Sequence, residues 1–204
     1  MTRGAAGLRF AVSAAEETAP GAAALDSSDR PMETLDAIRG VRVIRRFRDE
    51  AVADGVVDRI LDAGRHAGSS KNLQRWAFIV VRDRETLERL SHVGPWAGHL
   101  AGAAVGVALL TPRPDTADAP LSVLWDLGRA AQNMVLAAWD MGVGSVPATV
   151  YEHALCREIL GFPDEMHCEF LLSFGWPAQS EDLTRPPKAG GRQALGELVH
   201  RERW

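Results

Sequence analysis

The feature that most constrains the fold is a long apolar segment in the middle of the chain. Between Pro120 and Met141 the only helix breaker is Gly128. Apolar side chains recur there at helical spacing, at Leu124, Leu127, Ala131, Met134, Val135 and Ala138. The pattern predicts a helix over Ala119–Met141 that is apolar around most of its circumference. Such a helix needs cover on most sides, from its own sheet and from a second subunit.

The segments around this helix alternate between helical and strand periodicity. Amphipathic helices are predicted over residues 54–66, 84–93 and 152–160. Buried strands are predicted over residues 76–81, 103–110 and 168–174. We expect Asp54 to be the N-cap of the first helix and Gly68 to be its stop signal. The alternation favours a mixed sheet covered by helices.

Length and composition favour one globular domain. A chain of 204 residues can bury one full core, and a content of 46% hydrophobic and 25% charged residues is ordinary for a globular protein. Residues 1–31, rich in Ala, Gly, Ser and Glu, are expected to form a flexible extension to a domain over residues 32–204. Glu16 and Glu17 interrupt any signal-peptide core, and no apolar run approaches the roughly 18–20 residues of a membrane span. We therefore expect a cytoplasmic protein without a membrane partner.

Charge and spacing argue against several classes of function. A net charge of −4 provides no general attraction for nucleic acid. Cys156 and Cys168 are too few for a disulfide framework and are interpreted as small packing residues. The six histidines include no His-x-x-x-His pair beside an acidic partner, so no metal site is predicted.

Two polar clusters can carry chemistry. Arg42 and Arg45 lie three residues apart, so their guanidinium groups can reach one compact anion such as phosphate. The loop Ala67–Trp76 offers donors and acceptors suited to the edge of a polar heterocycle, from Ser69, Ser70, Asn72 and Gln74. Taken alone, the arginines also fit a solvated face, and the loop also fits a helix cap followed by a turn.

In combination with later motifs, these clusters resemble the nitroreductase superfamily. An Arg-x-x-Arg-x-Phe turn, a helix, an Ala-x-Ser-x-x-Asn-x-Gln-x-Trp loop and a strand follow one another at the family's spacing. Three more matches are the Ala-Ala-Gln-Asn-Met-Val-Leu-Ala-Ala helix ending in Gly-Val-Gly-Ser, the Leu-Gly-Phe-Pro-Asp turn at 160–164, and Phe-Gly-Trp-Pro-Ala at 174–178. The resemblance covers about residues 33–204. It implies an α+β fold, a three-layer sandwich with a mixed, mainly antiparallel sheet flanked by helices.

The resemblance also implies a homodimer with exchanged C-terminal tails and one FMN per pocket. The phosphate and ribityl clamp is expected at Arg42, Val43, Arg45 and Arg192. The loop that reaches a flavin held mainly by the other subunit is expected at Gly68, Ser69, Ser70, Asn72 and Gln74. The stretch over the isoalloxazine face is expected at Pro147, Ala148 and Thr149. Thr149 is the candidate for direct tuning of the ring, because a fixed dipole near N5 acts where hydride arrives.

The activity implied is electron transfer in two half-reactions. NAD(P)H reduces the flavin and leaves, and a small organic acceptor, such as a nitroaromatic or a quinone, then takes the electrons from the same face. The segment Ser91–Pro120 is expected to line the acceptor side. The flavin carries the chemistry, so no side chain need be a nucleophile or a metal ligand.

The chain also departs from the family's usual text. Val41 and Val43 stand where the family has an Arg and a Ser, and Gly68 and Arg75 replace two prolines of the loop. These changes weaken the expected clamp and loosen the loop. A deazaflavin in place of FMN, a flavin-binding dimer without turnover, and a specialised activity such as reductive dehalogenation, flavin cleavage or oxidation of a peptide-derived substrate therefore remain alternatives.

Overall fold

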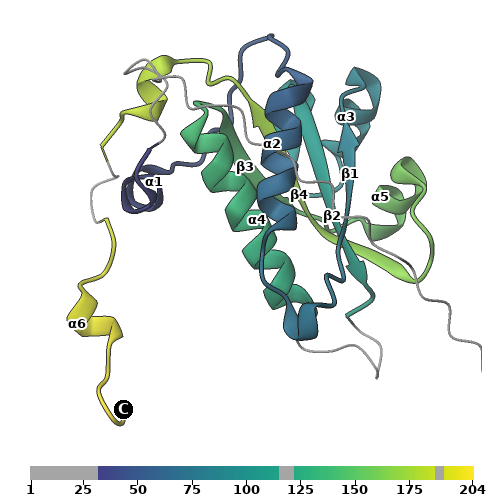
Figure 1. The fold of residues 1–204 in the computed structure, drawn as a ribbon. Coiled ribbons are helices and arrows are strands. Elements are labelled where there is room, and N and C mark those ends of the chain that lie inside the picture. The colour runs from purple at the N-terminus through teal and green to yellow at the C-terminus, as the bar shows by residue number, and fades with distance from the viewer. Residues whose placement is uncertain (1–31, 115–121, 187–190) are drawn as a thin grey trace, which may run out of the picture. The chain divides into compact units, whose positions relative to one another are not determined.

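The centre of the molecule is a four-stranded sheet in which every neighbouring pair is antiparallel. The structure is a computed structural model, and it describes residues 32–114, 122–186 and 191–204. The strands follow the order β1-β2-β4-β3 (Figure 1). Their bounds are Ala77–Val81 for β1, Val105–Pro112 for β2, Gly144–Thr149 for β3 and Met166–Gly175 for β4. A parallel bridge joins Val43, which lies outside the four strands, to Ser145 of β3, and adds the mixed element that was expected.

Helices cover both faces of the sheet and make three layers. The helices are α1 (Thr34–Gly40), α2 (Asp54–Arg65), α3 (Arg84–Leu90), α4 (Ser122–Asp140), α5 (His153–Leu160) and α6 (Leu195–Leu198). One core joins α2 and α4 to the face that carries Val107 and Leu172. The other core joins α3 and α5 to the opposite face, through Leu87, Cys156 and Leu171. The predicted α+β fold is therefore confirmed.

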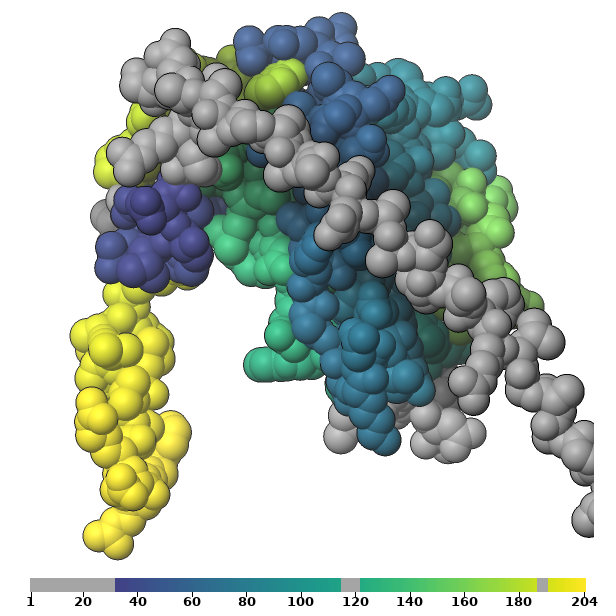
Figure 2. All heavy atoms as spheres, in the orientation of Figure 1, coloured from purple at the N-terminus to yellow at the C-terminus, as the bar shows by residue number. Residues whose placement is uncertain are grey.

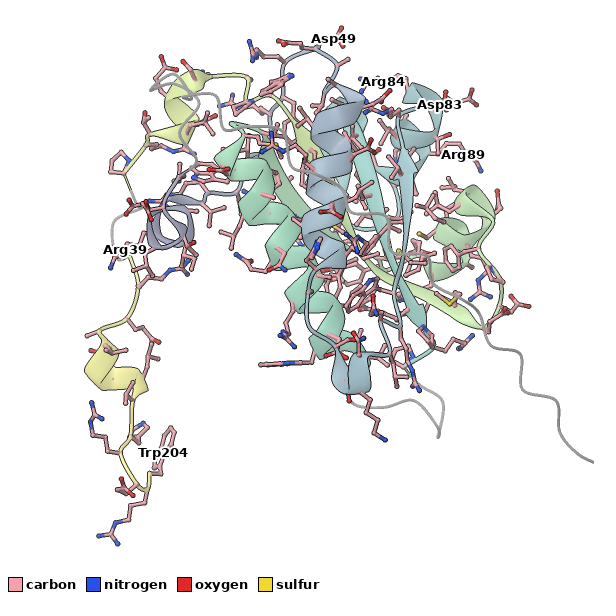
Figure 3. The ribbon with its side chains drawn as sticks, viewed as in Figure 1. Arg39, Asp49, Asp83, Arg84, Arg89 and Trp204 are labelled. Carbon is pink, nitrogen blue, oxygen red and sulfur yellow. The ribbon has the colours of Figure 1, made fainter. Side chains whose placement is uncertain are left out.

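Polar contacts join the helices α3 and α5, which are adjacent on one face, and cap the start of α3. Arg89 of α3 lies 3.0 Å from Glu158 of α5. Asp83, labelled in Figure 3, is the N-cap of α3. It accepts hydrogen bonds from the amide and the hydroxyl of Thr86. These two hydrogen bonds hold the pKa of the Asp83 carboxyl below its ordinary value.

Each predicted helix and strand is present within three residues of its expected bounds, and three further expectations were wrong. Asp54 is the first residue inside α2, and Ala53 is its cap, without a side-chain hydrogen bond. The helix ends at Arg65, before Gly68 is reached. The strand β1 is an edge strand with Ala77 and Val80 exposed, so the apolar run that ends at Val81 is only partly buried.

The long helix α4 confirms the predicted helix, with its described part starting at Ser122. Residues 115–121 lie outside the described part of the chain, so the expected start at Ala119 stays a prediction. Leu127, Met134 and Ala138 are buried against α2 and the sheet. Leu124 and Trp125 instead remain exposed, at 41% and 72%. None of the helices described has the length and apolarity needed to cross a membrane.

The C-terminal segment, residues 191–204, lies in no groove of the part of the chain that the structure describes. All residues from 191 to 204 are exposed, including Leu195 and Trp204 (Figure 2). The described residues of one chain therefore do not bury this tail, which the family resemblance implies is exchanged between the subunits of a dimer.

The segment that contains the arginine cluster packs against two paired glycines of the sheet. Gly144 of β3 and Gly175 of β4 are cross-strand partners. A Cβ atom at Gly144 would lie 2.7 Å from Ile44, and one at Gly175 would lie 2.8 Å from Phe47. The missing side chains thus make room for residues 44–47 to lie against the sheet.

We predict that Gly144→Ala destabilises the protein by about 1–3 kcal/mol, because the added methyl overpacks the buried, β-branched Ile44. Urea unfolding measures the effect. Gly55→Ala is the control: Gly55 lies in the first turn of α2 with no atom within 4 Å of an added Cβ, so stability should hold or rise. Equal stability of Gly144→Ala and wild type would contradict the packing argument.

Candidate functional site

Backbone hydrogen bonds fix the arginine segment along the edge of the sheet formed by β3. The amide of Ile44 donates to the carbonyl of Ser145 at 2.9 Å, and the amide of Arg48 donates to the carbonyl of Trp176 at 2.9 Å. The amide of Ala178 returns a hydrogen bond to the carbonyl of Arg46, also at 2.9 Å. Because Ile44 is buried, its neighbours Val43 and Arg45 are presented on the exposed side.

Arg42 is partly committed to its own chain. Its Nη1 atom donates to the carbonyl oxygens at the end of α1, those of Arg39, Gly40 and Val41, at 2.8, 2.8 and 3.0 Å. A cation at these carbonyls is favourable, since they are the negative end of the helix. The Nε atom of the same side chain is buried and has no hydrogen-bond partner in the described residues. Arg42 therefore retains a donor that needs an acceptor.

Arg45 lies between two cavities. The first, of about 480 Å³, is lined by Arg42, Val43, Arg45, Arg185 and Pro186. The second, of about 410 Å³, is lined by Arg45, Pro95, Trp96, Gly98, His99 and Pro147. The first cavity gathers three guanidinium groups and suits an anion, whereas the second has a mixed wall of aromatic, imidazole and proline groups. Since one side chain lines both, a ligand with an anionic tail and a flat polar ring could occupy the two together.

His99 is a polar group that the second cavity holds in one orientation. Its Nδ1 atom is 2.7 Å from the hydroxyl of Ser173, a fully buried residue of β4. Its Nε2 atom is buried and has no hydrogen-bond partner among the described residues. Burial lowers the pKa of His99 and the charge of Arg45 adds to this, while the carbonyl of Pro147 opposes it. The ring is therefore neutral near pH 7 and has one nitrogen available to a ligand.

The two unsatisfied nitrogens provide a test of fit for the expected flavin. Among the described residues, the buried side-chain polar atoms without a partner are Arg42 Nε and His99 Nε2. Each belongs to a residue that lines one of the two adjoining cavities. An unpaired buried polar atom is costly, so both positions favour a bound polar group. Phosphate oxygens can accept a hydrogen bond from Arg42 Nε, and the edge of a heterocycle can pair with His99 Nε2, so the residues present fit FMN.

The loop expected to contact a flavin from the other subunit lies elsewhere in this chain. Residues 70–72 form a short 3-10 turn, and the amide of Ser70 donates to the carboxylate of Asp126 on α4 at 2.8 Å. The amide of Gln74 donates to the hydroxyl of Ser69 at 2.9 Å, and the Gln74 side chain donates to that of Asn72 at 3.2 Å. Neither arginine cavity includes a residue of this loop.

The backbone of this loop is strained. Lys71, Asn72 and Gln74 have φ angles of 52°, 55° and 46°, which is the left-handed region that non-glycine residues rarely occupy. Each such residue costs roughly 1 kcal/mol or more, and such strain is typical of functional loops. Gly68 lies at the base of the loop, where an added Cβ would be 2.6 Å from the Arg129 guanidinium.

The remaining predicted residues occupy different environments. Pro147 is exposed and lines the second cavity with Arg45. Ala148 is buried in the core with α3 and α5, and Thr149 is half-buried at the end of β3. Arg192 is exposed on the C-terminal segment, and neither arginine cavity includes it. The structure thus brings together Arg42, Val43, Arg45 and Pro147.

Sequence reasoning missed four polar or aromatic residues of the candidate site: Trp96, His99, Ser173 and Arg185. Trp96 and His99 fall inside the segment that was expected to line the acceptor side, but no signal distinguished them within it. Arg185 follows the Phe-Gly-Trp-Pro-Ala motif and lies in a Pro-rich stretch without periodicity. Ser173 appears in the sequence as one residue of a buried strand, and only its contact with His99 reveals its role.

We predict that His99 titrates below its ordinary pKa of 6.5. As pH falls, the unfolded chain protonates first, so the stability that this residue contributes is complete above about pH 6.5 and is lost as pH falls through the folded-state pKa. NMR titration of the imidazole measures the value. Arg45→Ala should raise the pKa by removing a nearby positive charge, while Arg46→Ala, at the exposed neighbouring position, should not. A His99 pKa above 6.5 would contradict this.

Known proteins resemble this chain in sequence and in fold. The model of the Nitroreductase family matches residues 38–93 and 92–176. A protein of Archaeoglobus fulgidus named NADH dehydrogenase/NAD(P)H nitroreductase is 32% identical, over 84% of this chain and 99% of the relative. The NADPH:FMN oxidoreductase of Vibrio harveyi, solved with NAD+, has a TM-score of 0.72 and 26% identity, over 84% of this chain and 77% of that one. A Desulfovibrio desulfuricans structure named as a nitroreductase in complex with FMN has a TM-score of 0.68 and 30% identity, over 83% and 96% of the two chains. The chain belongs to the nitroreductase family.

Proposed function

We propose that this protein is a homodimeric flavin oxidoreductase that passes electrons from NAD(P)H through FMN to a small organic acceptor, such as a nitroaromatic or a quinone. The observation that carries the proposal is the pair of adjoining cavities that share Arg45. One is rich in guanidinium groups, the other is walled by Trp96, His99 and Pro147, and each includes a residue with an unsatisfied buried nitrogen. FMN and NAD(P)H are also the compounds in the names of the relatives.

In the first cavity, arginines would hold the anionic tail of the cofactor. Arg42 Nε, Arg45 and Arg185 can supply donors to a phosphate, and fork-shaped guanidinium groups suit phosphate oxygens. Val43 supplies no side-chain hydroxyl at this position, where the family has a serine. Arg185 is a third guanidinium in this cavity, so it partly offsets the expected loss of clamp residues at positions 41 and 43.

In the second cavity, the chain would hold the ring and leave one side open. When bound, FMN supplies the two-electron chemistry, while the protein supplies position and a fixed electrostatic field. His99 is oriented by Ser173 and is neutral, so Nε2 can exchange one hydrogen bond without placing a charge beside the ring. Trp96 is 75% exposed at the same cavity, and offers a flat apolar surface to an aromatic acceptor.

A second subunit would complete the site. The strained loop over Ser69–Gln74 lies apart from the arginine cavities, and Leu73 within it is 48% exposed. Leu124 and Trp125 of α4 and the apolar residues of the C-terminal segment are also exposed. These surfaces support a dimer in which the loop of one subunit reaches the flavin held by the other, and in which the tails are exchanged.

The proposal is tested by the colour, mass and turnover of the purified protein. We expect a yellow dimer with flavin absorption, FMN as the released chromophore, and steady oxidation of NADPH or NADH with a nitroaromatic or quinone. Light scattering coupled to gel filtration measures the dimer. A yellow protein without turnover would instead indicate a flavin carrier, and a released deazaflavin would replace FMN. A colourless monomer that stays colourless with excess flavin or deazaflavin would overturn the proposal.

We predict that Arg45→Ala weakens FMN binding by about 10–100-fold, because it removes a charge-assisted hydrogen bond worth roughly 1.5–3 kcal/mol. Fluorescence quenching of FMN titrated with apoprotein measures the dissociation constant. Arg46→Ala is the matched control, since Arg46 is an adjacent exposed arginine of the same segment. Equal losses in the two variants would show that only the general positive charge of this segment matters.

A further inference from the structure

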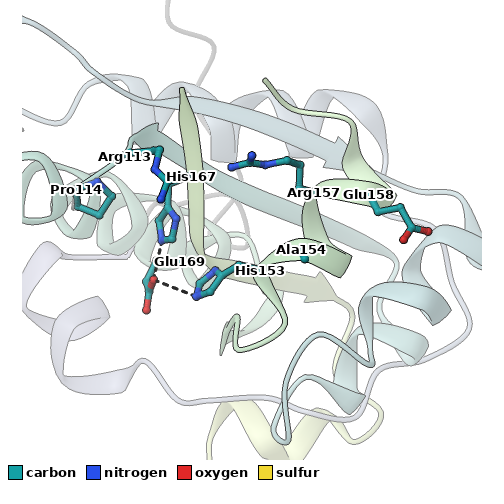
Figure 4. Close-up of a pocket in the computed structure, with 8 residues that line it drawn as sticks. All are labelled: Arg113, Pro114, His153, Ala154, Arg157, Glu158, His167 and Glu169. Atoms are coloured by element: carbon teal, nitrogen blue, oxygen red, sulfur yellow. Dashed lines mark hydrogen bonds and ion pairs between the residues drawn. The ribbon is translucent and has the colours of Figure 1, made fainter. Parts of the chain in front are cut away.

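A cluster of metal-ligating side chains lies away from the flavin cavities. His153 begins α5, while His167 and Glu169 lie two residues apart on β4. One ligand atom from each of the three lies within 4.8 Å of the other two (Figure 4). None of the three lines either cavity that contains Arg45. Spacing in the sequence could not reveal this cluster, because its members come from two elements that meet only in the fold.

The distances suit chelation. The Nε2 atom of His167 lies 2.8 Å from the Oε2 atom of Glu169, and the Nε2 atom of His153 lies 3.9 Å from the same oxygen. Two ligands that bind Zn²⁺ tetrahedrally at roughly 2.0–2.1 Å are about 3.3 Å apart. The two distances from Glu169 lie on both sides of this value, and all three ligand atoms lie within 4.8 Å of one another, so side-chain rotation can bring them around one ion.

A hydrogen bond to the backbone sets the tautomer of His153. Its Nδ1 atom is 3.2 Å from the carbonyl oxygen of Cys168, which can only accept, so Nδ1 carries the proton. This leaves the lone pair of the neutral ring on Nε2, the atom that faces Glu169. A carbonyl that fixes the tautomer in this way is the usual outer partner of a metal-bound histidine. The rings of His153 and His167 also lie 4.7 Å apart.

A β-bulge sets the position of Glu169. The register of β4 against β2 passes from Phe170 opposite Leu109 to Cys168 opposite Leu110, so Glu169 is the additional residue. Its carbonyl accepts instead from the amide of Val150, just before α5, at 2.9 Å. Bulges often redirect a side chain next to a functional site. Here the bulge places the Glu169 carboxylate beside both imidazoles, and its backbone hydrogen bond ties it to the chain that leads to His153.

The cluster opens into a cavity of about 750 Å³, whose wall also includes Arg113, Arg157 and Glu158. Arg157 pairs with Asp164 and donates to the carbonyl of Met166, and Glu158 pairs with Arg89. Much of the surrounding charge is thus paired. His153, His167 and Glu169 retain side-chain exposures of 45%, 17% and 32%, which leaves an entry path for an ion.

We propose that His153, His167 and Glu169 bind a divalent first-row transition-metal ion such as Zn²⁺. Two imidazoles and one carboxylate favour such an ion over Mg²⁺ or Ca²⁺, which prefer all-oxygen sites. Three protein ligands leave at least one position of the ion open to the cavity. The bound ion ties the first residue of α5 to β4, so it also stabilises the folded chain.

Calorimetric titration of ZnCl₂ into the EDTA-treated, flavin-containing protein tests the proposal. We expect about one tight ion per chain for wild type. His167→Ala and His153→Ala should each lose at least about tenfold in affinity, because even outer partners of a metal ligand are worth 10–100-fold. His92→Ala is the matched control: His92 also lies beside a carboxylate, 3.9 Å from Glu88, but outside the cluster, and its loss should leave the tight binding intact.

A crystal soaked in ZnCl₂ provides the second measurement. An anomalous difference peak at the zinc edge is expected between the three side chains, with metal–nitrogen distances of roughly 2.0–2.1 Å. Far-UV circular dichroism and retained flavin absorption establish that each variant is folded. If His167→Ala does not fold, His153→Ala carries the test, because His153 is the more exposed of the two histidines. Equal Zn²⁺ affinity in wild type and the folded variants, or a peak only at other residues such as Asp62 and His66, would overturn the proposal.

Discussion

The close approach of residues 44–47 to the paired glycines Gly144 and Gly175 is the constraint on which the site depends. With any larger residue in either strand position, Ile44 or Phe47 would be displaced. The hydrogen bond between Ile44 and Ser145 then fixes the register of the segment. This register sets Arg45 beside Pro147, and thereby joins the guanidinium cavity to the cavity with His99. A local packing feature of the sheet thus determines the geometry of the ligand site.

Sequence patterns predicted most of the fold because they report local periodicity, and they failed where the outcome depends on neighbours. The strand over Val105–Pro112 is apolar and buried, as expected, because it lies in the middle of the sheet. The similar run at Ala77–Val81 is half exposed, because no strand of the described chain pairs with its outer side. Hydrophobicity alone cannot distinguish a central strand from an edge strand. Asp54 likewise had the residue type of an N-cap, but the helix begins one residue too early for that role.

The site was predictable where short motifs carry it, and unpredictable where folding assembles it. Arg42 and Arg45 are close in sequence, so their common cavity could be expected. His99 and Ser173 are 74 positions apart and meet only because β4 lies beside the turn that precedes β2. Cys156 and Cys168 follow the expectation for packing residues, since both are free thiols buried in the core. The cluster of His153, His167 and Glu169 was not predicted, because linear spacing does not reveal residues that the fold and a β-bulge bring together.

The helix α4 shows that one subunit alone leaves part of the predicted apolar surface uncovered. Its inner side packs on α2 and the sheet through Leu127, Met134 and Ala138. The predicted apolar surface extends further around the helix, and Leu124 and Trp125 on it stay in solvent. Asp126, on the same turn, binds the amide of Ser70 and so couples this surface to the strained loop. A partner that covered Leu124 and Trp125 would therefore also approach that loop. In the proposed dimer, burial of α4 and completion of the flavin pocket are one event, so the same apolar surface would drive both assembly and cofactor binding.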